Sequence, residues 1–369
     1  MATIENLDHT ASPALLFDAD AIEHNLDLML KEVGNDPSLL RPHIKTHKCR
    51  KILDLHLDRK IKQVKCATIA EAECAAQAGI PDVLLSYPIV GPNIERFAEL
   101  ARKYPDTTFS CLVDDPGTLD SIENSEHTFT LLLDLDCGMH RTGIAPGKAA
   151  IEMIQFIEKS SNLTFGGIHA YDGHIHDGPL SIRQDRFDEA IKIVDDFIES
   201  LVEAGVDVPL VVSGGSPTFP MHATRAKSSS LNWQASPGTP VLWDAGYGEH
   251  YPEMGYAPAA LLLTRVISKP VSGHISIDLG HKSVSAENPI ENRVRFPELS
   301  ELEFVSQSEE HLVVRCAEAD TLPVGYPLIG IPYHVCPSVA LHNEAAIVRN
   351  KNVTDKRWSI TARGRKLTV

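Results

Sequence analysis

The sequence predicts an α/β fold in which a TIM-like (β/α)8 barrel is followed by a smaller all-β domain. Eight short apolar runs alternate with amphipathic stretches, as in βαβ units, and eight such strands favour a closed barrel over an open doubly wound sheet. From residue 259 the pattern changes to short β-type runs with turns between them and little helical periodicity. We therefore expect a barrel over residues 18–258 and a β domain over residues 259–369, which residues 1–17 join.

The expected barrel strands are apolar runs that lie between segments with helical spacing. They span residues 39–47, 61–68, 82–89, 108–115, 129–136, 163–171, 209–215 and 239–246. The open sheet loses support because no GxGxxG follows the first strand and no GxxxxGK[ST] motif occurs. The strand-like segment ALLFD, residues 14–18, precedes the first barrel helix and is expected to pair with the β domain.

The composition is that of a globular protein with an acidic surplus. The 369 residues are 43% hydrophobic, and 50 acidic against 34 basic residues give a formal charge of -16. This charge would repel nucleic acid and anionic membranes, although local cations can still bind a small anionic cofactor. Seven scattered cysteines indicate reduced thiols, and no apolar run of membrane length occurs. Because the N-terminal residues lack a basic segment followed by a long apolar core, we expect no secretory leader. We expect a cytoplasmic protein without nucleic-acid or membrane partners.

Lys45 ends the first expected strand within the basic motif RPHIKTHK. A lysine that lies near other cations and is partly withdrawn from water favours the neutral amine, which forms an imine with an aldehyde. The alternative is a solvated basic loop, which composition alone favours.

The segment SGGSPT follows the seventh expected strand and is suited to binding phosphate. Gly214 and Gly215 permit a close backbone approach, while Ser213, Ser216 and Thr218 offer hydroxyl groups. Barrels often hold phosphate near their seventh and eighth strands. An ordinary βα turn explains the segment about as well.

Three other positions carry candidate functional groups. Arg141 follows the fifth expected strand and can bind a phenolate or carboxylate, or instead bridge its loop to an Asp. His174 and His176, in HAYDGHIHD, are candidate bases or metal ligands, with solvated loop histidines as the alternative. His334 and Cys336 would point the same way on a strand and could bind a metal with open positions, although most such pairs are incidental packing.

Taken together, these motifs resemble the D-threonine aldolase and D-serine dehydratase group of fold-type III pyridoxal-phosphate enzymes. The resemblance spans the whole chain and rests on SPALLFD, RPHIKTHK, KCATIAEAE, DLDCGMHRTG, HAYDGH, SGGSPT and HVCP, in the order and spacing of the family. The family usually has Thr where this chain has Ser12, a change that we expect to be silent. The resemblance implies an alanine-racemase-like barrel with a β domain, and a homodimer.

The same resemblance implies roles for individual residues. Lys45 would carry the pyridoxal phosphate, Arg141 would contact its phenolic oxygen, and Tyr171 would lie beside its ring. The phosphate would be held by residues 213–218, with Gly238, Thr239 and Tyr247 nearby. His334 and Cys336 would hold a divalent metal beside the substrate. The thiolate favours zinc, the aldolases of the group are usually linked to manganese, and magnesium is a third candidate.

The function implied is that of a lyase acting on a D-amino acid with a β-hydroxyl group. We favour D-threonine aldolase, which yields glycine and an aldehyde, because His174 or His176 offers the additional base that C–C cleavage needs. The alternative lyase is a D-serine or 3-hydroxyaspartate dehydratase, which yields a keto acid and ammonia. A racemase and a non-catalytic pyridoxal-phosphate-binding protein are further alternatives.

Overall fold

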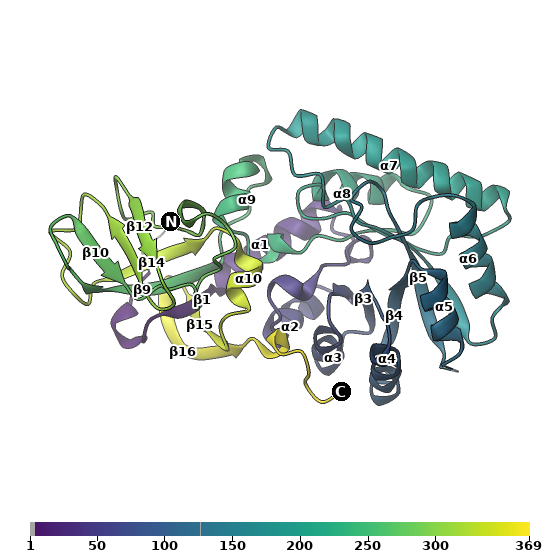
Figure 1. Ribbon diagram of the computed structural model, residues 1–369, viewed down its shortest axis with the longest axis horizontal. Helices are drawn as coiled ribbons and strands as arrows, with labels where there is room; N and C mark the ends of the chain where they lie inside the picture. Colours follow the sequence, from purple (N-terminus) through teal and green to yellow (C-terminus); the bar gives the residue numbers. More distant parts are fainter. Residues whose placement is uncertain (1–3, 126) are drawn as a thin grey trace. The chain divides into compact units, whose positions relative to one another are not determined.

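The computed structural model describes residues 4–125 and 127–369 and contains one parallel and one mostly antiparallel sheet (Figure 1). Residue contacts group the chain into two units. The barrel unit comprises residues 29–45, 52–238 and 364–369, and the β unit comprises residues 4–28, 46–51 and 239–363. The division at residues 18–258 and 259–369 stays a prediction about the extent of the domains.

The barrel unit is built on seven parallel strands that neighbour one another in chain order. They are β2 (Gln63–Cys66), β3 (Asp82–Pro88), β4 (Thr108–Val113), β5 (Phe129–Leu135), β6 (Leu163–Ala170), β7 (Val211–Ser213) and β8 (Trp233–Ala235). The helices between them are α3 (Ile69–Gln77), α4 (Pro92–Lys103), α5 (Pro116–Glu123), α6 (Lys148–Lys159), α7 (Leu180–Glu203) and α8 (Phe219–Ser228), with α2 (Arg50–Asp58) before β2. The strands carry short apolar runs because both faces of a parallel sheet are buried. This alternation confirms the predicted α/β class.

Residues 40–43 close the barrel by lying between its first and last strands. Leu40 forms a parallel bridge with Ala235 of β8, and His43 forms one with Lys65 of β2. The Arg41 N–H donates to the Ala235 carbonyl over 2.9 Å, and the Lys65 N–H donates to the Pro42 carbonyl, also over 2.9 Å. The predicted strand 39–47 is thus reduced to isolated bridges, since Pro42 has no N–H to donate and the chain turns at once into a 3-10 helix (Ile44–Thr46).

The predicted strand at residues 239–246 is wrong. That segment forms a 3-10 helix (Thr239–Val241) and the start of α9 (Ala245–His250), and the eighth strand is β8 instead. Asp244 caps α9 by accepting a hydrogen bond from the Tyr247 N–H over 2.8 Å, and Trp243 adopts a positive φ of 47°. Both features interrupt an extended chain. With three residues, β8 is too short to show a period-2 pattern.

The β unit contains a sheet in the order β12-β13-β10-β9-β1-β15-β16, with β14 also pairing β9, and β11 pairing β14. Its strands are β1 (Ala14–Asp18), β9 (Ala260–Ser268), β10 (His274–Ile277), β11 (Val294–Arg295), β12 (Glu303–Gln307), β13 (Leu312–Arg315), β14 (Pro327–Pro332), β15 (Glu344–Arg349) and β16 (Asn352–Ser359). Three helices complete the unit's main elements: α1 (Ala19–Glu32), which begins in it, α9, and α10 (Val335–Val339). β1 lies parallel to β15 and antiparallel to β9, which confirms the predicted pairing of ALLFD with late strands.

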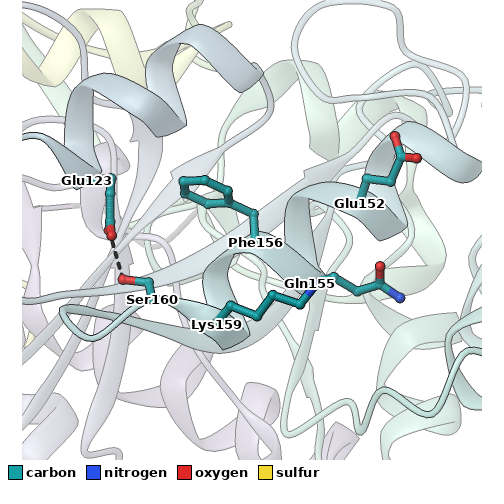
Figure 2. Close-up of a pocket in the computed structure, with 6 residues that line it drawn as sticks. All are labelled: Glu123, Glu152, Gln155, Phe156, Lys159 and Ser160. Atoms are coloured by element: carbon teal, nitrogen blue, oxygen red, sulfur yellow. Dashed lines mark hydrogen bonds between the residues drawn. The ribbon is translucent and has the colours of Figure 1, made fainter.

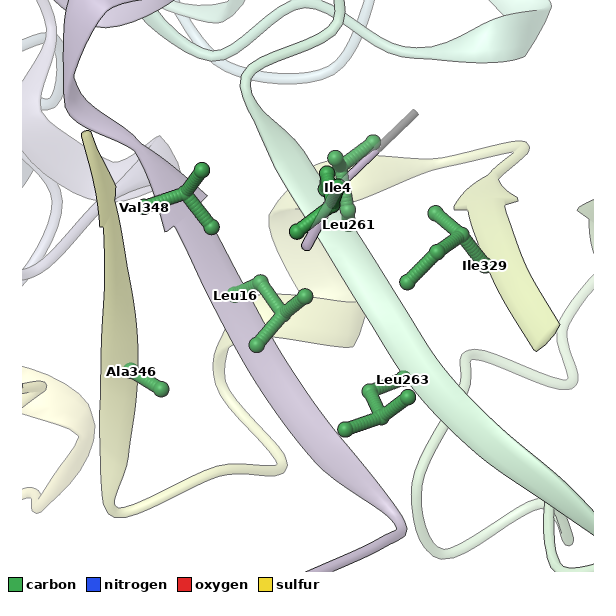
Figure 3. Packing of buried hydrophobic residues seen from close by; sticks show 7 residues of the cluster. All are labelled: Ile4, Leu16, Leu261, Leu263, Ile329, Ala346 and Val348. Atoms are coloured by element: carbon green, nitrogen blue, oxygen red, sulfur yellow. The ribbon is translucent and has the colours of Figure 1, made fainter. Parts of the chain in front are cut away.

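One face of this sheet is covered by an apolar cluster. Leu16, Leu261, Leu263 and Val348 alternate with residues of the opposite face along their strands, and Ile4, Ile329 and Ala346 complete the cluster (Figure 3). This period-2 spacing is why the N-terminal strand fits between β9 and β15 in one register. Among the residues that the structure describes, no helix is long and apolar enough to span a membrane.

We predict that Arg41→Ala lowers the free energy of unfolding by roughly 2–3 kcal/mol. Arg41 is buried, and its side chain joins residues 40–43, the closing segment, to the neighbouring strands by hydrogen bonds. Its guanidinium donates to both Asp82 carboxylate oxygens over 2.8 and 2.6 Å and to Gln234 over 2.6 Å. Urea unfolding measures the change. As a control, Arg102→Ala removes an exposed pair with Glu95 and should change stability by less than about 0.5 kcal/mol. Equal losses in the two variants would contradict this role of Arg41.

Candidate functional site

The ring of Tyr171 gathers three cationic side chains at the carboxyl ends of the barrel strands. Tyr171 directly follows β6, and its ring centroid lies 5.8 Å from Lys45 Nζ, 5.6 Å from Lys65 Nζ and 4.7 Å from Arg141 Cζ. Lys45 comes from the 3-10 helix after the closing segment, and Arg141 from the loop after β5. The structure therefore brings Lys45, Arg141 and Tyr171 together and adds Lys65, which the sequence analysis missed.

Lys65 is buried in β2 and is the first member of a polar chain inside the barrel. Its Nζ lies 3.4 Å from His169 Nε2, and His169 Nδ1 lies 2.7 Å from Asp134 Oδ1. Burial, and the nearby charge of Lys45, lower the pKa of Lys65 to about 7. Burial raises the pKa of Asp134, but the hydrogen bond and charge of His169 outweigh it and lower that pKa overall. The available signal in the sequence was three polar residues within apolar strands, each one residue before the strand ends.

A second series of polar contacts connects the loop after β6 with β7 and α8. The Ser213 hydroxyl lies 2.8 Å from His222 Nδ1, and His222 Nε2 lies 2.8 Å from Asp172 Oδ2. All three side chains are buried. Burial raises the pKa of Asp172, but the charge and hydrogen bond of His222 outweigh it, so the carboxylate stays ionised. Ser213 has no exposed surface, so it is not placed to act as a nucleophile with His222 as its base. We interpret the contacts of Ser213, His222 and Asp172 as ones that orient the loop after β7.

The loop at residues 213–218 has the features of an anion-binding turn. Thr218 is the N-cap residue of α8, a ten-residue helix, and the amino end of a helix favours negative charge. Gly214 adopts a φ of 83°, and the Ser216 hydroxyl accepts a hydrogen bond from the Gly238 N–H over 3.2 Å. The predicted loop residues and Gly238 therefore lie together in the barrel unit.

The two candidate bases of the loop after β6 differ in environment. His174 is partly buried, and burial lowers its pKa. A Cβ added to Gly138 would lie 3.1 Å from His174 Nε2, so His174 packs on the loop that carries Arg141. His176 is exposed, and its Nδ1 lies 2.9 Å from the His174 carbonyl. His174 is thus the histidine that contacts the loop of Arg141.

His334 and Cys336 lie at the start of α10 in the β unit, so the strand geometry expected for them is wrong. His334 is the N-cap residue, and its side chain is hydrogen-bonded to that of Cys336. The His334 ring also contacts Glu287 through Nδ1. Burial lowers the pKa of His334, but hydrogen bonds to Cys336 and Glu287 raise it overall to about 9. Within residues 4–125 and 127–369, no group of three or more His, Cys, Asp or Glu side chains is arranged as a metal site.

Thr239 and Tyr247 also belong to the β unit. Thr239 Oγ1 lies 3.9 Å from Cys336 Sγ. The ring of Tyr247 packs against Trp243 and Tyr251, with centroids 5.4 and 5.3 Å apart. The predicted contacts of Thr239 and Tyr247 with a phosphate stay predictions.

A surface pocket of the barrel unit lies away from the rim of the barrel, by which we mean the carboxyl ends of its strands. It is lined by Glu123, Glu152, Gln155, Phe156, Lys159 and Ser160, and the Ser160 hydroxyl donates to Glu123 over 2.8 Å (Figure 2). Glu123 and Ser160 end helices just before β5 and β6, so the pocket belongs to the amino ends of the strands. Active sites of such barrels lie at the opposite face.

We predict that Gly214→Ala destabilises the protein by roughly 1–3 kcal/mol more than Gly205→Ala. Both glycines have a positive φ, but an added Cβ at Gly214 would lie 2.2 Å from the His222 ring, whereas the one at Gly205 meets nothing within 4 Å. Thermal or urea unfolding of the two variants measures the difference. Equal losses would mean that the loop tolerates a side chain against His222.

The chain matches two family models and is similar to proteins with named activities. The family model described as "Alanine racemase, N-terminal domain" matches residues 17–239, and that described as "Putative serine dehydratase domain" matches residues 259–348. A D-threonine aldolase of Arthrobacter sp is 27% identical, over 96% of this chain and 93% of the relative. A 3-hydroxy-D-aspartate aldolase of Paracoccus denitrificans (strain Pd 1222) is also 27% identical, over 96% and 92%.

Solved structures show the same similarity. The crystal structure of D-threonine aldolase from Filomicrobium marinum matches with a TM-score of 0.86 and 27% identity, over 98% of both chains. The D-threo-3-hydroxyaspartate dehydratase from Delftia sp. HT23, at 19% identity and a TM-score of 0.80 over 97% of this chain and 99% of that one, shares the fold. The resemblance seen in the sequence is thereby confirmed, and the chain belongs to the family defined by the alanine racemase N-terminal domain.

Proposed function

We propose that this protein is a pyridoxal-phosphate-dependent lyase that cleaves D-β-hydroxy amino acids, with D-threonine aldolase activity favoured. The observation that carries the proposal is the position of Lys45 at the barrel rim, beside the Tyr171 ring and its partner Arg141. Two aldolases that match almost the full length of the chain support it.

The residues at the rim fit pyridoxal phosphate. Lys45 would supply the amine that bonds to the aldehyde, Tyr171 would pack by the ring, and Arg141 would bind the phenolic oxygen. The turn at residues 213–218, with Gly238 beside it and α8 behind it, fits the phosphate because a helix amino end and glycine backbone favour an anion. The bound cofactor would supply an electron sink for the bond that breaks at the substrate Cα.

The chain's own residues would move the protons. In an aldolase, His174 or His176 would take the proton of the β-hydroxyl group. We favour His174 because it is partly buried, its pKa is lowered by burial, and it packs on the Arg141 loop, whereas His176 is exposed. In a dehydratase, Lys45 would instead take the Cα proton. Because this loop supplies a base in addition to Lys45, the aldolase is favoured.

Incubation with D-threonine and D-serine tests the proposal. We predict acetaldehyde and glycine from D-threonine in equal amounts, with little ammonia or keto acid from either substrate. Keto acid and ammonia without aldehyde would replace the aldolase with a dehydratase. Lys45→Ala should lose both turnover and the absorption band of lysine-bound pyridoxal phosphate, and persistence of that band would overturn the assignment of Lys45.

We further propose that His334 and Cys336 bind a divalent metal. Imidazole and thiolate donors in contact suit zinc, with manganese and magnesium as the other candidates. Glu287 engages Nδ1 of His334, which leaves Nε2 as the metal-binding nitrogen, and a carboxylate on the other nitrogen is the usual arrangement for a histidine ligand. A homodimer and a cytoplasmic location complete the proposal and rest on the resemblance and the composition.

A chelator should abolish turnover, and added zinc or manganese should restore it. We predict that His334→Ala and Cys336→Ser each lower the stoichiometry of bound metal, measured by elemental analysis, and lower kcat/KM at least tenfold. Cys316→Ser changes a thiol of the same unit outside the pair and should leave both quantities unchanged. Full activity after exhaustive chelation would favour a racemase or another metal-independent reaction.

A further inference from the structure

We propose that Lys65 is a proton-accepting residue of the barrel site, kept ready by the His169–Asp134 pair, and that it exchanges a proton beside the amine of Lys45. The inference rests on the proposed function in one respect, that the cofactor and substrate bind at the Tyr171 ring. The resemblance noted in the sequence assigns no role to Lys65.

The first support is the position of Lys65. Its side chain is 2% exposed, yet its Nζ lies as close to the Tyr171 ring as that of Lys45, at 5.6 against 5.8 Å. A lysine that serves only solubility would not be buried, because desolvation penalises an ammonium ion. A buried amine on the ring that also receives Lys45 belongs to the same site.

The second support is the order of hydrogen bonds behind the amine. Asp134 is ionised and only accepts, so His169 donates through Nδ1 and its Nε2 is left as an acceptor that faces Lys65. Burial and the charge of Lys65 lower the pKa of His169, so its ring stays neutral and Nε2 accepts an N–H from Lys65 when the amine is protonated. Because the pKa of Lys65 is about 7, part of the amine is neutral near neutral pH. The neutral amine can then accept one proton from a group on the substrate. Only N–H bonds form and break on the protein, and no further reactant is needed.

The charges around the Lys65 amine bring its pKa close to neutral pH. The groups that face it are Lys45, Arg141, Asp134, Asp172, His169 and Tyr171, from the 3-10 helix after the closing segment, from β5 and β6, and from the loops after those two strands. Burial and the two cations lower its pKa, the two carboxylates raise it, and the result is about 7. An amine that titrates near neutral pH can both accept and release a proton.

The test follows Lys65 directly in the full-length protein labelled with carbon-13 at lysine Cε, with and without pyridoxal phosphate. We expect one lysine resonance to titrate with a midpoint about pH 7 and to be missing in Lys65→Met. Lys62→Met, which changes the exposed lysine of the same segment, should keep it. Asp134→Asn should move the midpoint to lower pH, because the Asp134 charge raises the pKa of Lys65.

Two readouts of the loaded protein complete the test. In Lys65→Met and Lys65→Arg, the cofactor absorption should lose its change near neutral pH while the bond to Lys45 still forms, and kcat should fall roughly 10²-fold with little change in KM. A wild-type protein without a lysine that titrates near neutral pH, or an unchanged pH profile in both variants, would overturn the inference. If the chain binds no pyridoxal phosphate, the proposed function fails, and the lysine titration still decides the behaviour of Lys65.

Discussion

The pairing of residues 40–43 with both edge strands of the parallel sheet is the constraint on which the barrel site depends. A seven-stranded sheet leaves one edge of β2 and one edge of β8 without partners, and unpaired strand edges must be covered or closed. The closing segment bonds to both edges at once, through the Arg41 and His43 N–H groups on one side and the Pro42 carbonyl on the other. Lys45 therefore reaches the rim two residues after the last bridge.

Closure also determines the charge pattern of the rim. It places Lys45 opposite the β6 end that carries Tyr171, while β2 places Lys65 on the same ring. Lys45, Lys65 and Arg141 form a local concentration of positive charge in a chain whose formal charge is -16. Because short-range interactions within a partly buried site are screened less than the surface field, these cations can attract an anionic cofactor despite the acidic exterior.

The sequence predicted those parts of the site that lie where strands end. Lys45, Arg141, Tyr171 and the turn at residues 213–218 follow apolar runs, and in a parallel barrel all strand ends meet at one rim. Lys65, Asp134 and His169 were missed because they lie inside such runs, where the interpretation was simply a buried strand. A polar residue inside a buried strand must have a partner, so its presence was itself a signal.

Other features depend on contacts that no spacing reveals. His222 is one residue of a helix, and only the fold brings it between Asp172 and Ser213. Residues 239–246 have the composition of a strand, yet the cap that Asp244 provides for α9 decides their conformation. The contact of His334 with Cys336 was foreseen from their spacing, but the start of a helix, rather than a strand, produces it.

In both buried carboxylate–histidine pairs, the carboxylate binds one nitrogen of the imidazole ring and leaves the other nitrogen for a different group. Asp134 faces Nδ1 of His169, which leaves Nε2 for the amine of Lys65, whereas Asp172 faces Nε2 of His222, which leaves Nδ1 for the hydroxyl of Ser213. In each pair the ionised carboxylate fixes the imidazole tautomer, so the free nitrogen is an acceptor directed at one group. One pair ends at the amine of Lys65, and the other at the Ser213 hydroxyl, which begins the turn at residues 213–218. Buried carboxylates behind the rim therefore orient the side chains that face it.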